Sequence, residues 1–299
     1  MNNIRVSVVI PSYNSERTII PCLESVTNQD LEQQFEVIVV DSSVDSTSDL
    51  ITRKFPGVKL IKLHRKTDPG TARNLGVRKA RGEIIAFIDS DCVASPGWLS
   101  GINSAHQSEY AAVGGPVING NPESIASWAG YLVEFSEWLP GNSQRFVKHI
   151  PTCNISYKRI VFERFGGFSA ALYPQEDFLY NLKLAEVGER ILFEPKIEVK
   201  HSHRTRLRHF LTHQMRRGKS ALEVRKRALT RGAFLVNYPY LAPLVLPLLL
   251  PKRVITITVR FLKRRPAGVL TLLYSLPFVA LGTVFWIAGF LKEAYTKKN

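Results

Sequence analysis

Short apolar runs alternate with helical stretches over the first 90 residues, and this alternation limits the possible folds more than any other feature. Four runs predict strands that are buried on both faces: residues 5–10, 36–40, 58–63 and 83–88. Residues 18–28, 46–54 and 71–80 between them predict helices. Repeated strand–helix units build a parallel sheet with right-handed crossovers. The predicted fold class is therefore α/β, a Rossmann-like and mostly parallel sheet with helices on both faces.

Polar clusters follow three of these predicted strands. They are residues 11–14 (PSYN), 41–45 (DSSVD) and 89–91 (DSD). Ligands of open parallel sheets bind at the carboxyl ends of the strands, which meet at one edge. The sequence therefore predicts that the three clusters gather into one site.

The cluster Asp89-Ser90-Asp91 has the composition of a metal site. Two carboxylates at a strand end can reach a hard divalent cation, directly or through its waters. Such a cation, Mg²⁺ or Mn²⁺, would offset charge on a departing diphosphate. The alternative interpretation is a loop whose acids cap the helix that begins near Pro96.

Two further clusters open predicted helices. Gly70 allows a ligand to approach a helix N-terminus, and Arg73 adds a forked donor for phosphate. The alternative is a plain helix start at Gly70, with Arg73 paired to a surface acid. Glu176-Asp177 offers a carboxylate that can act as a general base on an acceptor hydroxyl. Taken alone, the pair is better explained by capping of the following helix.

The middle of the chain is less regular. It predicts strands at residues 111–118, 190–193 and 196–200, a helix at 179–187 and a tight turn at 165–168. The three cysteines, Cys22, Cys92 and Cys153, have neither paired nor metal-ligand spacing, which indicates a reducing, cytosolic environment. The polar start and the short run at residues 6–10 predict a first strand rather than a signal peptide.

The positive charge is confined to the C-terminal third. Of 40 Lys and Arg, 19 lie in residues 201–299 beside only two acids, whereas residues 1–200 carry a net charge of −2. The almost uncharged stretches 234–250 and 266–291 adjoin these basic residues. Basic residues that flank apolar stretches are typical of membrane contact, so membrane lipids, and no nucleic acid, are the predicted partners.

Residues 205–231 predict one strongly basic amphipathic helix. Its apolar stripe, at a period of about 3.6 residues, is Leu207, Leu211, Met215, Leu222 and Leu229. A helix of this kind lies on a membrane surface or packs, solvated, on the catalytic domain.

The two apolar stretches differ as membrane segments. Residues 266–291 are long enough to span a bilayer as a transmembrane helix, although Pro277 also permits a helical hairpin. Residues 234–250 contain three prolines and precede a basic loop at 251–265, which predicts a re-entrant or interfacial segment.

The chain resembles family 2 glycosyltransferases of the GT-A fold over residues 5–218. The resemblance rests on ordered motifs: residues 6–14 (VSVVIPSYN), Asp41, residues 70–74 (GTARN) with Gly76, Gly82 leading to residues 89–91, Glu176-Asp177, Pro195, His201 and residues 214–217 (QMRR). It implies a single in-line displacement that inverts the anomeric carbon of a nucleotide-sugar, of the UDP type.

The resemblance also implies roles for individual residues. Pro11, Tyr13 and Asp41 would hold the base and ribose, Asp89 would face the nucleoside, and Arg73 would meet the phosphates. Asp91 would ligate the metal, with Asp89 and His201 beside it. Asp177 would be the catalytic base.

Two positions depart from the family pattern. An acid often follows the Asp41 position, where this chain has Ser42, although Asp45 keeps an acid nearby. Processive polymer synthases carry a tryptophan where this chain has Gly218, so transfer of one sugar per encounter is expected.

Three segments follow from these patterns: a GT-A catalytic domain (1–203), a basic interfacial helix (204–232) and a hydrophobic membrane-associated region (233–299). The predicted acceptor is a hydroxyl of a lipid-linked saccharide or cell-envelope glycan. The predicted location is the cell membrane, with the catalytic domain on its cytoplasmic face.

Three alternatives remain at this point. A polyprenyl-phosphate glycosyl synthase would use an anionic nucleophile and would not need Asp177. A nucleotidyltransferase would need a Gly-rich, basic loop after the first strand, and residues 11–14 do not provide one. A non-catalytic membrane scaffold would not need Asp89, Asp91 and Asp177 together.

Overall fold

The computed structural model describes residues 4–228 and 232–296. Contacts divide them into two units: residues 4–118 with 142–201, and residues 119–141 with 202–296. The second unit thus takes in a segment from within the predicted catalytic domain. The two units are described separately below.

An eight-stranded sheet forms the core of unit 1. Its strand order is β3-β2-β1-β4-β9-β6-β10-β8. The strands are β1 (Val6–Ser12), β2 (Phe35–Asp41), β3 (Lys59–Lys62), β4 (Ile84–Ile88), β6 (Ala112–Gly114), β8 (Arg145–Val147), β9 (Asn154–Lys158) and β10 (Ile191–Phe193). Strands β1 to β4 are parallel, whereas β9 runs antiparallel to both β4 and β6. The predicted fold class, a mixed α/β sheet rich in parallel strands, is confirmed.

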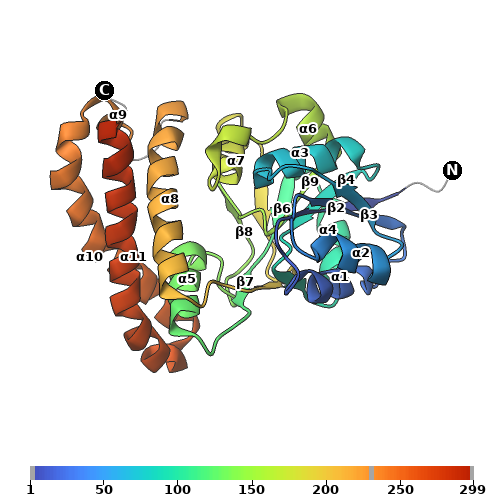
Figure 1. Cartoon of the computed structure of the whole chain (residues 1–299), viewed down its shortest axis with the longest axis horizontal. Coiled ribbons are helices and arrows are strands. Elements are labelled where there is room, and N and C mark those ends of the chain that lie inside the picture. Colours follow the sequence, from blue (N-terminus) through green and yellow to red (C-terminus); the bar gives the residue numbers. More distant parts are fainter. Residues whose placement is uncertain (1–3, 229–231, 297–299) are drawn as a thin grey trace. The chain divides into compact units, whose positions relative to one another are not determined.

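Helices cover both faces of this sheet. They are α1 (Ile19–Thr27), α2 (Thr47–Lys54), α3 (Pro69–Lys79), α4 (Trp98–Ala105), α6 (Arg159–Phe165), η1 (Ala170–Leu172) and α7 (Glu176–Glu186). Helices α1 and α2 lie on one side of the parallel strands and α3 on the other (Figure 1). Helix α3 approaches β1 closely because Gly76 has no side chain: a Cβ there would lie 2.3 Å from Val9 Cγ1.

A second, three-stranded sheet carries one residue of the predicted site, His201, and begins next to another, Asp91. It has the order β5-β11-β7, with β5 at Cys92–Ala94, β11 at Val199–His201 and β7 at Val117–Asn119. The single strand predicted over residues 111–118 is therefore wrong, because the chain passes from β6 to β7 at Gly115. A Cβ on Gly115 would lie 2.1 Å from the carbonyl oxygen of Ile197. In the pairing of β5 with β11, Cys92 lies opposite His201.

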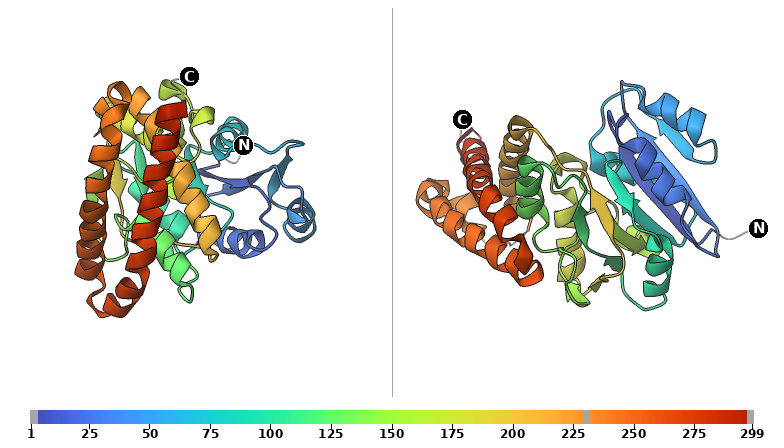
Figure 2. Two further views of the ribbon diagram at one scale, coloured as in Figure 1. Left: turned by 60° about the vertical axis from the view of Figure 1, so that its left-hand side comes forward. Right: turned by 90° about the horizontal axis from the view of Figure 1, so that it is seen from below.

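Unit 2 is helical. Its elements are α5 (Ile125–Phe135), α8 (Leu207–Arg227), α9 (Phe234–Asn237), η2 (Pro239–Leu241), α10 (Ala242–Arg264), η3 (Pro266–Gly268) and α11 (Val269–Thr296). Helix α11 lies between α10 and α8 in both Figure 1 and Figure 2. By length and apolar composition, one helical stretch, Pro266–Thr296, is long enough to cross a membrane.

The proline-containing region differs from its prediction in two ways. Residues 251–264 are helical, because Ile257 and Phe261 lie one turn apart and are both buried, so the basic loop predicted there is wrong. The apolar residues 242–250 belong to this same helix, which bends by 41° near Leu248. Helix α11 continues through Pro277, so the alternative of a hairpin within it is also excluded.

The buried face of α8 is rotated away from the predicted leucine stripe. Leu207 is exposed, and Leu211 and Met215 are only half-buried. The buried positions instead include Phe210, Gln214, Gly218, Ala221 and Leu222. Leu222 alone among the described stripe residues is buried as predicted; Leu229 lies outside the described residues.

Glycines bring the backbones of α8 and α11 together. A Cβ on Gly218 would lie 1.9 Å from the carbonyl oxygen of Trp286, and one on Gly289 would lie 2.0 Å from that of Met215. No side chain fits at either point unless the helices separate. The position where processive synthases have tryptophan is thus a helix–helix contact in this chain.

We therefore predict that Gly218→Ala lowers the stability of the full chain. Alanine favours helix by up to about 1 kcal/mol over glycine, but overpacking against backbone costs about 1–3 kcal/mol, so the net effect should be destabilising. Thermal unfolding of the two proteins measures the difference. Arg216→Ala, at an exposed position of the same helix, is the matched control and should leave the melting temperature unchanged. An equally stable Gly218→Ala protein would contradict this packing.

Candidate active site

The predicted polar clusters do lie at one edge of the main sheet. Strands β1 and β2 are parallel and in register, so Ser12 pairs with Asp41, and the segment after β4 lies beside them. The Tyr13 ring at this edge is 38% exposed. Lys66 Nζ lies 4.2 Å from the centroid of that ring. An exposed aromatic ring beside a cation suits a nucleotide, which has a flat base and charged phosphates.

Asp41 lies beneath this edge rather than on it. It is fully buried, and its carboxylate accepts hydrogen bonds from the hydroxyls of Ser43 and Ser48. In the present arrangement it therefore fixes the loop after β2. Asp45, close to the position of the missing second acid, accepts hydrogen bonds from the backbone N–H and hydroxyl of Thr47 at the start of α2. The predicted contacts of Pro11 and Asp41 with a nucleoside stay predictions.

A buried ion-pair network connects three of the motifs. Arg73, on the first turns of α3, is 4% exposed. Its Nη2 lies 2.6 Å from Asp89 Oδ1, after β4, and its Nη1 lies 2.8 Å from Glu176 Oε1, at the start of α7. Burial alone would lower the pKa of Arg73, but the two carboxylates raise it above its ordinary value, so the guanidinium stays charged. The predicted phosphate contact of Arg73 is untested, and these contacts indicate a positioning role.

The adjacent acids Glu176 and Asp177 have different environments. Glu176 is 3% exposed, and burial raises its pKa to about 7 against the opposing effect of Arg73. Asp177 is half-buried, and its Oδ2 accepts hydrogen bonds from the backbone N–H of Thr152 at 3.1 Å and from the Thr152 hydroxyl at 3.2 Å. One acid thus binds Arg73, and the other is held by Thr152 nearer the surface.

Asp91 and His201 form the part of the site that fits a metal ion. His201 Nε2 lies 3.6 Å from Asp91 Oδ1. A cation with ligand bonds of about 2.1 Å can reach two atoms this far apart. Cys92 Sγ also lies within 4.8 Å of both atoms, but sulfur is a soft donor that Mg²⁺ and Mn²⁺ bind poorly. Carboxylate and imidazole therefore suit the expected cation, whereas Asp89 already has Arg73 as its partner.

The ion pairs of Arg73 bring these acids together. Arg73 contacts Asp89, two residues before Asp91, and it also contacts Glu176, the residue before Asp177. A hydrogen bond to Cys92 lowers the pKa of the buried Cys153 thiol, but burial together with the charges of Asp89, Asp91 and Asp177 raises it overall, in agreement with these contacts. The acids predicted to face opposite ends of the transferred sugar are thus brought together in unit 1.

Sequence reasoning missed three contributors. Thr152 precedes β9 without any motif of its own, Lys66 lies in a basic loop, and the pairing of Arg73 with Glu176 joins residues 103 positions apart. For the pairing of Arg73 with Glu176, the only sequence signal was the arginine in the first helical turn of residues 70–74.

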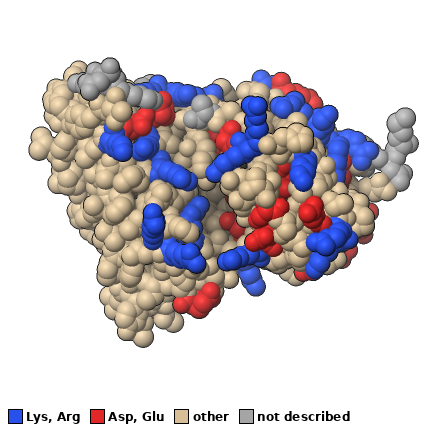
Figure 3. Space-filling model, viewed as in Figure 1, with Lys and Arg blue, Asp and Glu red and all other residues tan. Residues whose placement is uncertain are grey.

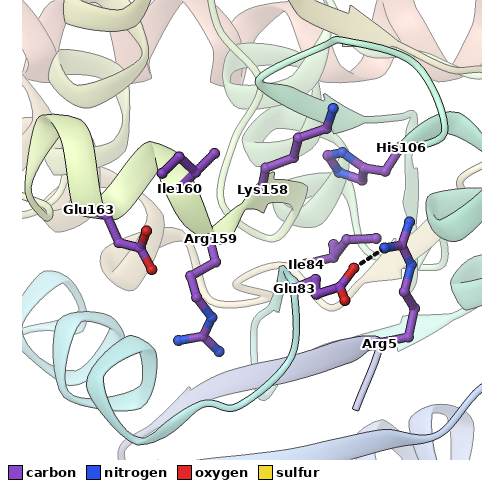
Figure 4. Close-up of a pocket in the computed structure, with 8 residues that line it drawn as sticks. All are labelled: Arg5, Glu83, Ile84, His106, Lys158, Arg159, Ile160 and Glu163. Atoms are coloured by element: carbon purple, nitrogen blue, oxygen red, sulfur yellow. Dashed lines mark hydrogen bonds and ion pairs between the residues drawn. The ribbon is translucent and has the colours of Figure 1, made fainter. Parts of the chain in front are cut away.

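A separate pocket of about 430 Å³ lies at the opposite edge of the sheet, where β1 and β4 begin (Figure 4). In it, Arg5 is paired with Glu83, Lys158 donates to the carbonyl of Ser108, and Arg159 donates to that of Gly82. Its three basic side chains therefore already have partners within the protein. None of the predicted site residues lines it.

Comparisons with known proteins agree with the α/β fold of this chain. The sequence profile of glycosyl transferase family 2 matches residues 7–165. A glucosyl-dolichyl phosphate glucuronosyltransferase of Haloferax volcanii is 28% identical over 220 residues, which are 66% of this chain and 69% of the relative. A Pyrobaculum calidifontis mannosyltransferase, solved with GDP-Man and Mn²⁺, has a TM-score of 0.68 at 21% identity and covers 98% of this chain and 88% of its own. GalNAc-T7, solved with UDP, GalNAc and Mn²⁺, has a TM-score of 0.55 at 19% identity and covers 68% of this chain and 44% of its own.

The ion-pair network predicts a large effect of Arg73→Gln on stability. Removing one partner of a buried pair leaves uncompensated charge and costs about 3–5 kcal/mol. Urea unfolding of the full chain measures this loss. The control is Arg81→Gln, which removes a 71% exposed partner of Glu36 and should cost less than about 1 kcal/mol. Equal stabilities of the two variants would show that the Arg73 network does not stabilise the fold.

Proposed function

Because the chain belongs to glycosyl transferase family 2, we propose that it moves one sugar from a nucleotide diphosphate sugar to a hydroxyl of a membrane-associated acceptor, with inversion. The observation that carries this proposal is the Arg73 ion-pair network, which joins Asp89, two residues before Asp91, to Glu176, the residue before Asp177. Inverting displacement needs a stabilised leaving group on one side of the sugar and a base on the other. The edge offers residues suited to both tasks.

The leaving-group side is assigned to Asp91 and His201. These two would hold Mg²⁺ or Mn²⁺, which when bound offsets negative charge on the departing diphosphate. Both solved relatives contain Mn²⁺. Arg73 keeps the Asp89 carboxylate in place beside them, and the positive charge of Lys66 lies close to the Tyr13 ring. The proposed donor is of the UDP type; one solved relative holds UDP and the other GDP-Man, so the base is a matter for experiment.

The base is assigned to Asp177. Two hydrogen bonds from Thr152 fix one of its oxygens, and its half-exposed position lets an acceptor hydroxyl approach. Glu176 is less suited, because it is buried and bound to Arg73. Thr152 is a positioning residue: its hydroxyl orients the carboxylate without contacting the sugar.

The acceptor is proposed to be a lipid-linked saccharide or a cell-envelope glycan at the cytoplasmic face of the cell membrane. The apolar helix Pro266–Thr296 and the basic residues of the C-terminal third support a membrane location. The Haloferax relative is named for a dolichyl phosphate substrate. Gly218 packs against the backbone of α11 and offers no aromatic platform, which supports transfer of single sugars rather than polymerisation.

A screen of nucleotide-sugars tests the reaction. We expect release of a nucleoside diphosphate from one donor, more readily from UDP-sugars than from GDP-sugars, and loss of that release after chelation. Asp91→Ala should abolish release and weaken nucleotide binding only when Mn²⁺ is present. Asp45→Ala, which removes a nearby loop carboxylate outside the proposed metal set, is the control and should keep the metal response. Full activity of the chelated wild type would refute the metal assignment.

The base assignment is tested by comparing Asp177→Asn with Glu176→Gln. Asp177→Asn removes the proton acceptor and keeps the shape, so turnover should fall by about 10²–10⁴ while donor binding persists. Glu176→Gln should change donor affinity or stability more than turnover, because Glu176 acts through Arg73. If only Glu176→Gln loses turnover, Glu176 is the base and Asp177 is not. Turnover retained in both would point to an anionic acceptor such as a polyprenyl phosphate.

A further inference from the structure

Unit 2 exposes a broad apolar surface on α10 and α11. The exposed side chains of α10 recur at helical spacing, and those of α11 continue the surface: Leu244, Leu248, Ile255 and Val259, then Leu270, Leu273, Tyr274, Leu281 and Val284. Figure 3 shows a wide area over these helices with few charged side chains. Apolar area on this scale marks a contact with a partner or a membrane.

The charges beside this surface indicate that it contacts an anionic lipid leaflet. Residues 251–265 carry six Lys and Arg and no acid. Tyr238, Tyr240 and Tyr274 are at least half exposed, and tyrosine is common at the boundary between lipid and water. Basic residues beside apolar side chains match lipid headgroups above acyl chains.

The packing of α11 on α8 argues against a crossing. From Gly282 to Gly289 the helix lies against α8, with Phe210, Met215 and Gly218 in contact. Helix α8 carries seven Lys and Arg between Leu207 and Arg227. If this half of α11 lay in the hydrocarbon core, the charged side chains of α8 would have to lie there too, at a high cost in free energy. The remaining thirteen residues, from Val269 to Leu281, extend about 20 Å, which is short of the bilayer core of about 30 Å.

Helix α10 is tied to polar groups along its length. Arg253, near its middle, donates to the carbonyl of Val133 on α5, and Arg260 pairs with Glu137 at 3.2 Å. A transmembrane α10 would carry these groups into the hydrocarbon.

Between α5 and α8 lies a further buried polar cluster around Glu134. Its carboxylate lies 3.4 Å from His213 Nε2 and 3.3 Å from Arg217 Nη1, and accepts a hydrogen bond from Gln214. Burial would raise the pKa of Glu134, but these neighbours hold it well below its usual range, so the carboxylate stays charged. Because α5 and α8 both pack on α11, a crossing would also place this charged cluster at membrane depth.

We infer that α10 and α11 lie along a single anionic leaflet and that neither crosses the bilayer. Both ends of α11 then face the same compartment. This inference rests on the membrane association proposed above and specifies its form. The surface binds lipid through the apolar residues of α10 and α11, and the exposed basic residues Lys252, Lys263 and Arg265 meet the headgroups.

Cysteine labelling in cell-derived membranes tests the topology. Ala267→Cys and Lys292→Cys mark the two ends of α11 at exposed positions, and the native Cys22, Cys92 and Cys153 are buried. A membrane-impermeant maleimide should label both variants in inside-out vesicles and neither in spheroplasts of the bacterial expression host. Labelling of the two ends from opposite sides would overturn the inference while leaving membrane association intact.

Flotation with lipid vesicles tests the surface itself. Wild-type protein should bind vesicles of mixed phosphatidylcholine and phosphatidylglycerol more tightly than vesicles of phosphatidylcholine alone. Leu244→Glu with Leu248→Glu should weaken binding at least about tenfold, because two carboxylates replace apolar side chains that would be buried among the acyl chains. Ile160→Glu with Val187→Glu, at exposed apolar positions of unit 1, is the control and should bind as wild type.

The remaining outcomes distinguish an error in the assigned surface from an error in the proposed membrane association. Unchanged vesicle binding of the Leu244/Leu248 variant would overturn the assigned surface. If that variant instead loses self-association, the surface binds a second copy of the chain. Wild-type protein that binds neither vesicle would refute the membrane association on which the inference rests.

Discussion

The site depends on one buried guanidinium. Arg73 is 4% exposed and binds Asp89 and Glu176, which follow β4 and begin α7. A buried charge of this kind needs charged partners, and the two carboxylates on Nη1 and Nη2 fix where three chain segments meet. Gly70, on the same turn, leaves room for this meeting: a Cβ there would lie 3.1 Å from Glu176 Cγ. The helix start that resembles an anion site therefore organises acids of the protein itself.

The next residue of this helix extends the same frame. Asn74 donates to the carbonyl of Phe168 and accepts from its N–H, which holds the turn before α7. Gly167 permits that contact, since a Cβ there would lie 2.3 Å from Asn74 Oδ1. Arg73 and Asn74, which are consecutive residues of one motif, thus hold the start of α7 at two points. The position of Asp177 is fixed as a result. Preorganised acids of this kind act without the cost of moving into position during the reaction.

Local patterns predicted those parts of the fold that local forces determine. The first four strands were recognised because each is a short apolar run, and the acids at the sheet edge follow from the topology of a parallel sheet. Burial on both faces was predicted correctly for β1, β2 and β4 but wrongly for β3, which lies at the edge of the sheet and is exposed at Lys59 and Lys62. The buried face of α8 was predicted wrongly because an apolar pattern gives most weight to leucine. The face that packs on α11 instead contains the small residues Gly218 and Ala221. Pairing of Arg73 with a surface acid was one of two alternatives that the sequence allowed, but its burial and the identity of its partner were out of reach, since Glu176 is 103 residues away. Thr152 has no motif at all, and its importance is visible only from its hydrogen bonds to Asp177.

The different environments of Glu176 and Asp177 show how structure assigns roles that composition leaves open. Adjacent residues on a helix point about 100° apart, so the sheet edge can bury one and expose the other. Glu176 is turned toward Arg73, where burial raises its pKa to about 7 and its charge serves the network. Asp177 is turned toward Thr152, whose N–H and hydroxyl bind one oxygen of its carboxylate. A base needs an accessible lone pair more than it needs a high pKa, and of the two acids Asp177 is the more accessible. The geometry thus supports the proposed division of roles, in which Glu176 holds Arg73 and Asp177 is the base.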